Sequence, residues 1–344
     1  MAIRLIQVGL GGWGLDWAEA VLPDVASAKV VAFVDADPKV LQSAAQRLSL
    51  PPDSLFPNLR TALGAVEADA VLVVLPLAAH VPVSAAALQA GKHVLVEKPF
   101  APTLEEARAL NALAAQCGRV LMVSQNYRHH AAVATVARLL RSGEMGKVLS
   151  SNIEFRKNWK VTSHRYYEIP GPLLLDMAVH HFDLVRLLFG EVARLACRSW
   201  NTPDSPFREH AAAEAILEMQ SGMIVGYHGS WLSRGAPTTW GGAWTIECEE
   251  GVVAFSARGF HGSAEDEVVV YGPDGSARHV PLAKLAHIDR AGALAAFAAA
   301  VTTGHPPPDF TSGTDNIRSL ALCFASMRSA AAGGSWIAPA DFAG

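Results

Sequence analysis

The sequence predicts two successive domains: an α/β domain with a doubly wound parallel sheet, then an α+β domain with a large, mostly antiparallel open sheet. A chain of 344 residues exceeds what one hydrophobic core usually serves. Short apolar runs alternate with helical stretches up to about residue 123, and strand-like segments follow one another in the second half. We therefore expect a dinucleotide-type domain at 1–123 and a second domain at 124–344, whose C-terminal helices can pack back on the first.

The parallel sheet is predicted from five short runs rich in Val, Leu and Ile, which are typical of strands covered on both faces. Helices are expected between them. The helix at 38–48 begins with Pro38 in its first turn, and the helix at 103–117 has Thr103 and Glu106 at capping-box spacing. The predicted strands are 4–8, 30–35, 70–75, 93–96 and 120–123.

The second domain is predicted to combine a few helices with a series of strands separated by turn signals such as Ser221-Gly222. A polar, aromatic-rich segment at 157–169 interrupts the regular pattern. The predicted helices are 130–142, 173–189, 289–303 and 314–331, and the predicted strands are 148–156, 193–200, 213–219, 223–231, 243–248, 252–256 and 268–271.

Composition excludes several classes of protein. With 51% hydrophobic and 17% charged residues, the chain can bury large cores. The net charge of -4 and the lack of a basic tract argue against nucleic acid as a partner. The longest apolar run, 70–79, is too short to span a membrane, and the N-terminus lacks a signal-peptide pattern. Four scattered cysteines indicate reduced thiols in a cytoplasmic protein and no metal site.

A glycine motif of the form G-x-G-x-x-G lies between the first strand and a predicted helix at 13–22. In this context the first glycine permits a tight turn, the second lets the backbone approach a pyrophosphate, and the third allows close helix–strand packing. The helix N-terminus also favours an anion. We therefore expect dinucleotide contacts from Gly9, Gly11, Gly12, Trp13 and Gly14.

Asp35 ends the second predicted strand, 21 residues after Gly14 (35 − 14). A carboxylate there can accept hydrogen bonds from the ribose hydroxyls of NAD and would repel the 2′-phosphate of NADP. No arginine follows directly. The sequence therefore favours NAD over NADP.

Two further groups point to the reaction centre. Glu97-Lys98-Pro99 follows a parallel strand, where a lysine can stabilise the charge of a reacting oxygen. On a helix, Asp176, His180 and Asp183 would share one face. His180 is suited to take a proton from an alcohol, and Asp176 could orient it or bind a substrate hydroxyl. The alternatives are a buried polar network or a metal site, for which a third ligand at helical spacing is missing. His181 points elsewhere and is interpreted as structural.

Together, these motifs resemble the Gfo/Idh/MocA oxidoreductases, the family of glucose–fructose oxidoreductase and inositol dehydrogenase. Segments similar to those of the family are 90–99, 142–148, 171–183 and 311–320. The resemblance covers nearly the whole chain. It implies a catalytic triad of Lys98, Asp176 and His180, with His180 as the acid/base.

The chain departs from the family pattern after the fourth strand. Family members often have Thr-Pro-Asn-x-x-His, whereas this chain has Leu75-Pro76-Leu77-Ala78-Ala79-His80. The asparagine is absent, so its contact must be replaced or lost. Pro76, His80, Glu97 and Lys98 remain expected cofactor contacts, and the similarity of 125–128 to a segment beside the nicotinamide adds Asn126.

Substrate contacts are expected from the segment that precedes the His180 helix. Aromatic faces stack on sugar rings, and cationic side chains bind hydroxyls, carboxylates or phosphates. The alternative is a solvated loop with packing aromatics. The positively charged side chains of this segment would also suit a sugar acid or a nucleotide sugar. The expected contacts are Arg156, Trp159, Tyr166 and Tyr167.

The sequence therefore predicts a cytoplasmic, NAD-dependent oxidoreductase that transfers a hydride between a ring hydroxyl or ketone of a sugar, inositol or sugar derivative and nicotinamide. One alternative is an enzyme that recycles tightly bound NAD, of the glycosidase or oxidoreductase type. Another is a non-enzymatic ligand sensor on the same fold. By analogy with the family's C-terminal sheet, a homodimer or homotetramer is expected.

Overall fold

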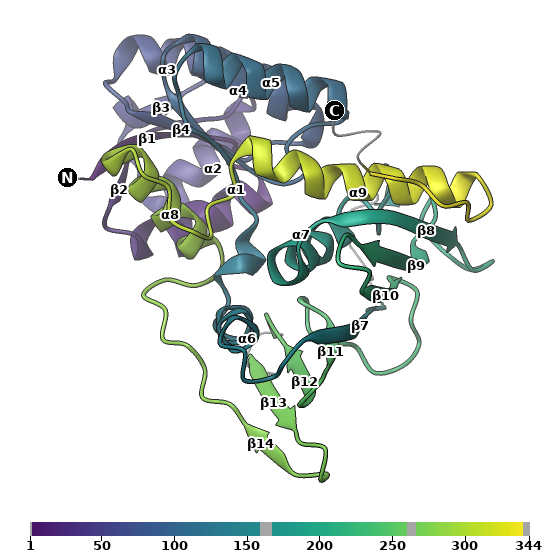
Figure 1. Ribbon diagram of the computed structural model, residues 1–344. Helices are drawn as coiled ribbons and strands as arrows, with labels where there is room; N and C mark the ends of the chain where they lie inside the picture. Colours follow the sequence, from purple (N-terminus) through teal and green to yellow (C-terminus); the bar gives the residue numbers. More distant parts are fainter. Residues whose placement is uncertain (1, 159–166, 260–265, 340–344) are drawn as a thin grey trace. The chain divides into compact units, whose positions relative to one another are not determined.

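The computed structural model describes residues 2–158, 167–259 and 266–339. The chain forms two compact units (Figure 1). The first contains Met1–Asn126 and Ala286–Ile317, and the second contains Tyr127–Leu285 and Arg318–Gly344. The chain therefore passes between the units at more than one point.

The first unit is built on a six-stranded sheet in the order β3-β2-β1-β4-β5-β6, in which every pair is parallel. This confirms the predicted doubly wound domain. The two-residue strand β3 was not predicted, because its pattern is too short to be distinctive. The strands are β1 (Ile3–Val8), β2 (Ala28–Val34), β3 (Leu55–Phe56), β4 (Ala70–Val73), β5 (His93–Val96) and β6 (Leu121–Val123).

Helices cover this sheet, and local signals set their ends. Asp37 caps α2 by accepting from the Lys39 backbone N–H at 2.8 Å, and Thr103 caps α5 by accepting from the Glu106 N–H at 3.1 Å. The bounds are α1 (Gly12–Asp16), which continues as a π-helical turn (Trp17–Val21), α2 (Pro38–Leu48), α3 (Leu59–Ala65), α4 (Leu77–Gln89) and α5 (Leu104–Gln116).

Helix α8 (Asp289–Thr303) returns from the far end of the sequence to the first unit. Its buried Leu294 and Phe297 belong to the same hydrophobic core as Leu5 and Leu72 of the parallel sheet. Figure 1 shows α8 beside α1, near β1 and β2. Because small alanines dominate this helix, it can approach the sheet closely.

The second unit contains an eight-stranded sheet in the order β14-β13-β12-β11-β7-β10-β9-β8. The β10–β7 pair is parallel, and the other pairs are antiparallel. This confirms the predicted large, mostly antiparallel sheet. Its strands are β7 (Val148–Arg156), β8 (Val192–Trp200), β9 (Ala212–Met219), β10 (Ile224–Ser230), β11 (Ala243–Cys248), β12 (Gly251–Ser256), β13 (Glu267–Tyr271) and β14 (Ala277–His279).

Two helices of the second unit pack on this sheet: α6 (Ala131–Arg141) against β12 and β13, and α7 (Ala178–Phe189) against β10 and β11. Helix α9 (Gly313–Ala331) begins in the first unit and continues in the second. Helix α7 is shorter than the predicted 173–189, because residues 172–177 form turns. Asp176 therefore precedes the helix, and its expected place on one helix face with His180 and Asp183 is wrong.

Candidate active site

The glycine loop after β1 has two positions that only glycine fits. Gly9 has a φ of +102°, and a Cβ there would lie 1.9 Å from the carbonyl oxygen of Val74. A Cβ on Gly14 would lie 2.2 Å from the carbonyl oxygen of Gly9. Because a side chain would clash at both positions, the first glycine of the motif permits the tight turn and the third allows close helix–strand packing, as expected.

Gln7, on β1, holds this loop in place. It is fully buried, and its Nε2 donates to the carbonyl oxygens of Gly9 at 2.9 Å and Gly14 at 2.7 Å. Sequence reasoning missed this residue. The signal was a polar side chain near the end of a strand in which only Arg4 is also polar, and a buried polar group must find partners.

Gly11 and Gly12 face open space, because a Cβ added at either meets no atom within 4 Å. Trp13 next to them is 47% exposed. The loop thus offers bare backbone, with no side chain in front of it, to an incoming ligand. This is the cradle that the phosphates of a dinucleotide require, and the residues present fit such a cofactor.

Asp35, just after β2, is fixed beside the glycine loop. Its Oδ2 accepts from the Leu10 backbone N–H at 2.8 Å, and its Oδ1 accepts from the Asp37 N–H at 2.9 Å. Each carboxylate oxygen can accept a second hydrogen bond. The carboxylate can therefore still receive ribose hydroxyls while it supports the loop.

Lys98 lies at the carboxyl end of β5, in the first unit, and is half-buried. The neighbouring Glu97 is buried and accepts from the Trp17 indole Nε1 at 2.8 Å and from the Lys98 backbone N–H at 3.2 Å. The Glu97 carboxylate therefore fixes the backbone that carries Lys98. Trp17 was not among the predicted site residues.

His80, on α4, braces the same segment. Its Nδ1 lies 2.9 Å from the carbonyl oxygen of Pro99, and its Nε2 lies 2.7 Å from that of Leu75. Burial lowers the pKa of His80, while its contacts with these two carbonyl oxygens act in the opposite direction. Pro76 is exposed at the end of β4, where it precedes α4.

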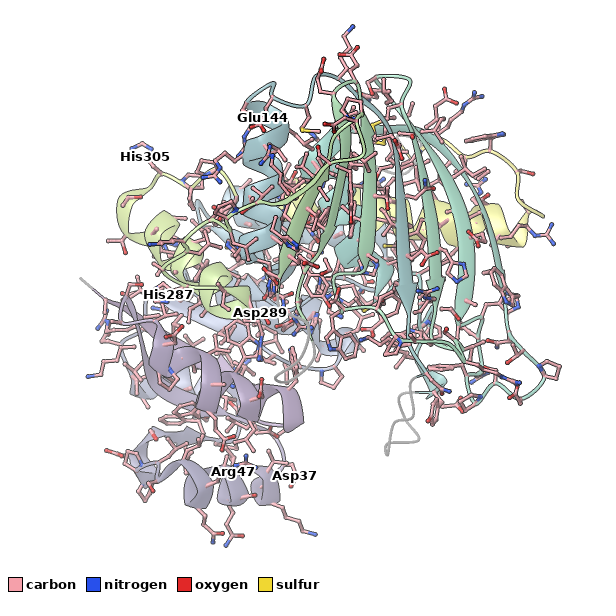
Figure 2. The ribbon with its side chains drawn as sticks, turned by 90° about the horizontal axis from the view of Figure 1, so that it is seen from below. Asp37, Arg47, Glu144, His287, Asp289 and His305 are labelled. Atoms are coloured by element: carbon pink, nitrogen blue, oxygen red, sulfur yellow. The ribbon has the colours of Figure 1, made fainter. Side chains whose placement is uncertain are left out.

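Asn126 lies at the end of the first unit's β6 segment and is buried. Its amide donates to the carboxylate of Asp289, the first residue of α8. Figure 2 labels Asp289 at the start of this helix. Its backbone has a φ of +53°, a conformation that non-glycine residues seldom adopt. The interaction ties the returning helix to the strand ends of the parallel sheet.

His180, in the first turn of α7, is the central residue of the second unit's candidate site. Its side chain is buried, and its ring stacks on that of Tyr127, with centroids 4.0 Å apart and planes 6° apart. The Arg258 guanidinium lies over the Tyr127 ring, and its Nη1 donates to the Tyr127 hydroxyl at 3.2 Å. The stack fixes the plane of the imidazole. Arg258 follows β12, and no sequence pattern singled it out.

A second cation lies near Arg258. The Lys157 ammonium donates to the carbonyl oxygen of Thr238 at 2.6 Å and lies 4.6 Å from the ring centroid of Trp240. Burial, with a further contribution from the positive charge of Arg258, lowers the pKa of Lys157 to about 8. Two cationic side chains from the ends of β7 and β12 therefore share one region of the second unit.

Asp183 belongs to a buried ion pair. Its carboxylate accepts from the Arg128 guanidinium through two hydrogen bonds, of 2.6 and 2.7 Å, and from the Ser319 hydroxyl at 2.8 Å. This arrangement holds α7 against the segment that carries Tyr127. Asp183 thus has a structural role.

His181 has the environment expected of a structural histidine. It is fully buried, with its Nδ1 3.2 Å from the Tyr227 hydroxyl and its Nε2 3.1 Å from the carbonyl oxygen of Trp240. Burial lowers the pKa of His181 to about 4. A neutral ring that donates from Nε2 and accepts at Nδ1 satisfies both partners.

The four predicted substrate residues have different outcomes. Arg156 lies at the end of β7, 41% exposed, with its Nη2 3.3 Å from the Glu154 carboxylate. Tyr167 packs edge-on against Phe207, with centroids 5.1 Å apart. Trp159 and Tyr166 lie outside the described residues.

The predicted catalytic residues fall in both units. Lys98 belongs with the glycine loop and Asp35 in the first unit, and Asp176 and His180 belong to the second. Asp176 is half-buried in the turns before α7.

All four cysteines are free thiols, as expected. In residues 2–158, 167–259 and 266–339, no helix is long and apolar enough to cross a membrane, and no three His, Cys, Asp or Glu side chains gather as metal ligands would.

A parallel sheet with a glycine cradle, followed by an α+β unit with a large open sheet, is the architecture of a two-domain dinucleotide-binding protein. The chain belongs to the Gfo/Idh/MocA family. Residues 3–125 match the family's oxidoreductase domain with its NAD-binding Rossmann fold, and residues 133–278 match a GFO/IDH/MocA C-terminal domain.

The chain is 32% identical to D-apiose dehydrogenase from Paraburkholderia graminis over 62% of its own length and 56% of that enzyme. A crystal structure of an oxidoreductase from Agrobacterium radiobacter with NAD+, L-tartaric acid and magnesium shares the fold, with a TM-score of 0.87, 20% identity and 99% coverage of both chains. An Azotobacter vinelandii inositol dehydrogenase homolog with NADH and myo-inositol has a TM-score of 0.82, at 19% identity and 98% coverage of both.

Proposed function

We propose that the protein is an NAD-dependent dehydrogenase that oxidises a ring hydroxyl of a sugar, polyol or sugar derivative to a ketone, or catalyses the reverse reduction. The observation that carries the proposal is the setting of His180. Its imidazole is buried and held flat by Tyr127, on the α+β unit of a family whose relatives include sugar dehydrogenases. An imidazole held in one fixed orientation is suited to act as the general acid or base toward a bound alcohol.

In this reaction, bound NAD supplies the acceptor for the hydride at C4 of its nicotinamide. The chain's own residues handle the proton and the oxygen. His180 takes the proton from the alcohol, Lys98 donates a hydrogen bond to the reacting oxygen and stabilises its developing negative charge, and Asp176 orients His180 or binds a neighbouring hydroxyl. Tyr127 covers one face of the imidazole and keeps water from it.

Asp35 favours NAD over NADP in this proposal. Its carboxylate is fixed by the Leu10 and Asp37 backbone N–H groups, so it cannot easily turn away from a ligand in the glycine loop. A 2′-phosphate there would face a negative charge at short range, which is unfavourable.

Two neighbouring cationic side chains of the second unit, Lys157 and Arg258, favour an acidic substrate within the sugar class. The positive charge of Arg258 is near enough to lower the pKa of Lys157, and Arg258 contacts the tyrosine that stacks on His180. A carboxylate is a good partner for such a pair of cations. Sugar acids therefore belong in the first substrate panel beside neutral aldoses and inositols.

The experiment is an assay of NADH formation from NAD across aldoses, inositols, anhydrosugars and sugar acids. The expected result is turnover of one class, which Lys98→Ala and His180→Ala abolish while both variants still bind NAD. Loss of NAD binding in either variant would contradict its assigned role. NAD that co-purifies with the protein, with no net NADH formed on any substrate, would instead favour a recycled cofactor.

A further inference from the structure

Arg290 is a buried cation in contact with the glycine loop. It lies in the first turn of α8, in the first unit, and is 9% exposed. Its guanidinium carbon lies 4.1 Å from the ring centroid of Trp13 and 5.5 Å from that of Trp17. Its Nη2 donates to the carboxylate of Asp16 on α1.

The hydrogen-bonding capacity of this guanidinium is only partly used. Nε and Nη1 are buried and have no hydrogen-bond partner. Buried arginine N–H groups are normally paired, because removing them from water without a partner is costly. An arginine whose N–H donors are not all paired, and which lies beside a ligand-binding loop, is a typical anion-binding residue in proteins.

The glycine loop itself supplies no positive charge. Residues 9–14 contain no charged side chain, and the backbone at Gly11 and Gly12 faces open space. The Trp13 side chain, which covers one face of Arg290, is about half exposed and can turn on its side-chain bonds. A small rotation of this indole would expose the Arg290 guanidinium to a ligand bound at the glycine loop.

We propose that Arg290 binds the pyrophosphate of the dinucleotide, with Asp16 competing for the same guanidinium and Trp13 acting as its movable cover. This inference rests on the cofactor of the proposed function. The cation that the glycine loop lacks is then contributed by a residue almost 280 positions later in the sequence (290 − 12 = 278), carried by the helix that returns to the first unit.

The test compares Arg290→Gln with Asp16→Asn. Both variants remove the ion pair between Arg290 and Asp16, so they separate a binding role from a structural one. Dissociation constants for NAD, ADP and adenosine are measured by calorimetry on the full-length protein, and tryptophan fluorescence reports movement of Trp13. Arg290→Gln is expected to weaken NAD and ADP at least tenfold and to leave adenosine, which has no phosphate, unchanged. Asp16→Asn is expected to leave NAD and ADP affinity unchanged or to tighten it.

Equal weakening of NAD by the two variants would overturn the proposal, as would an Arg290→Gln protein that binds ADP like the wild type. If Arg290→Gln fails to fold, Asp16→Asn still decides: weaker ADP binding by that variant overturns the proposal, and unchanged or tighter binding supports it. No sugar is present in these measurements. A protein that shows the predicted binding pattern but oxidises no substrate would therefore refute the proposed dehydrogenase while leaving the role of Arg290 intact.

Discussion

The indole Nε1 of Trp17 donates a hydrogen bond to Oε1 of Glu97 at 2.8 Å, across 80 residues of sequence. Trp17 is fully buried, and Glu97 is 5% exposed. The other oxygen of the same carboxylate accepts from the Lys98 backbone N–H. The helical segment after the glycine loop therefore helps to fix the segment that carries the proposed catalytic lysine, so the cofactor loop and Lys98 share one rigid support.

Replacing Trp17 by Phe should weaken this support. The Glu97 oxygen would lose its buried donor, which costs about 1–3 kcal/mol of unfolding free energy. Because the Lys98 backbone would be less well held, turnover should fall more than NAD affinity. The measurement is a double-mutant cycle with Glu97→Met, which has a similar length but no oxygen acceptor, using urea unfolding and steady-state kinetics. Additive effects of the two substitutions would mean that the hydrogen bond contributes nothing.

Asp35→Asn should shift cofactor preference. Asparagine keeps an oxygen that can accept from the Leu10 N–H but removes the charge that opposes a 2′-phosphate. The ratio of NADP to NAD affinity should rise about tenfold, equivalent to about 1.4 kcal/mol. Asp35→Ala, which also removes the support of the loop, is the comparison. An unchanged ratio in Asp35→Asn would remove Asp35 from the cofactor assignment.

Gly11→Ala and Gly14→Ala should act in different ways. The alanine methyl at position 11 meets no atom of the protein, so unfolding free energy should hardly change, whereas NAD affinity should fall because the methyl occupies the ligand's approach. At position 14 the methyl meets the Gly9 carbonyl, and we expect a loss of about 1–3 kcal/mol of stability or more. Thermal unfolding and NAD titration separate the two effects. Full NAD affinity in Gly11→Ala would place the cofactor elsewhere.

Arg128→Met should destabilise the second unit strongly. The Arg128 and Asp183 side chains are only 6% and 2% exposed, so the substitution leaves a buried carboxylate without its main cation. Breaking such a pair costs about 3–5 kcal/mol. Arg128→Met combined with Asp183→Leu should recover much of this loss, because no lone charge remains. Chemical unfolding followed by circular dichroism measures both variants, and a double variant no more stable than Arg128→Met would contradict the ion-pair explanation.

His181 should make stability depend on pH. Its pKa is about 4 in the folded protein and near 6.5 in the unfolded chain. As the pH falls, the unfolded chain therefore takes up the proton before the folded protein does. The contribution of His181 to the free energy of unfolding is fully present above pH 6.5 and is lost as the pH falls toward 4. The difference corresponds to about 3 kcal/mol. His181→Gln, which cannot titrate, should show a shallower loss of unfolding free energy between pH 7 and 4.5. Parallel curves for the two proteins would contradict the assignment.

Much of the fold could be predicted because its signals are local. The alternation of apolar runs, the capping residues Asp37 and Thr103, and the glycine spacing all act within a few residues of where they stand. The ends of α7 were harder to predict. Residues 172–177 carry an apolar pattern compatible with a helix, but hydrogen bonds such as Ala178 N–H to the Leu173 carbonyl form turns instead.

The sequence by itself determined the class of protein, the glycine cradle, Asp35 and the proposed catalytic residues, because residue type and spacing carry that information. Only the tertiary structure decided which distant side chains meet. It placed Gln7 under the glycine loop, Trp17 on Glu97, Tyr127 on His180, Arg258 on Tyr127, and Arg290 against Trp13. These pairs depend on how helices and strands pack, and that packing follows from burial of the whole core and leaves no short motif in the chain.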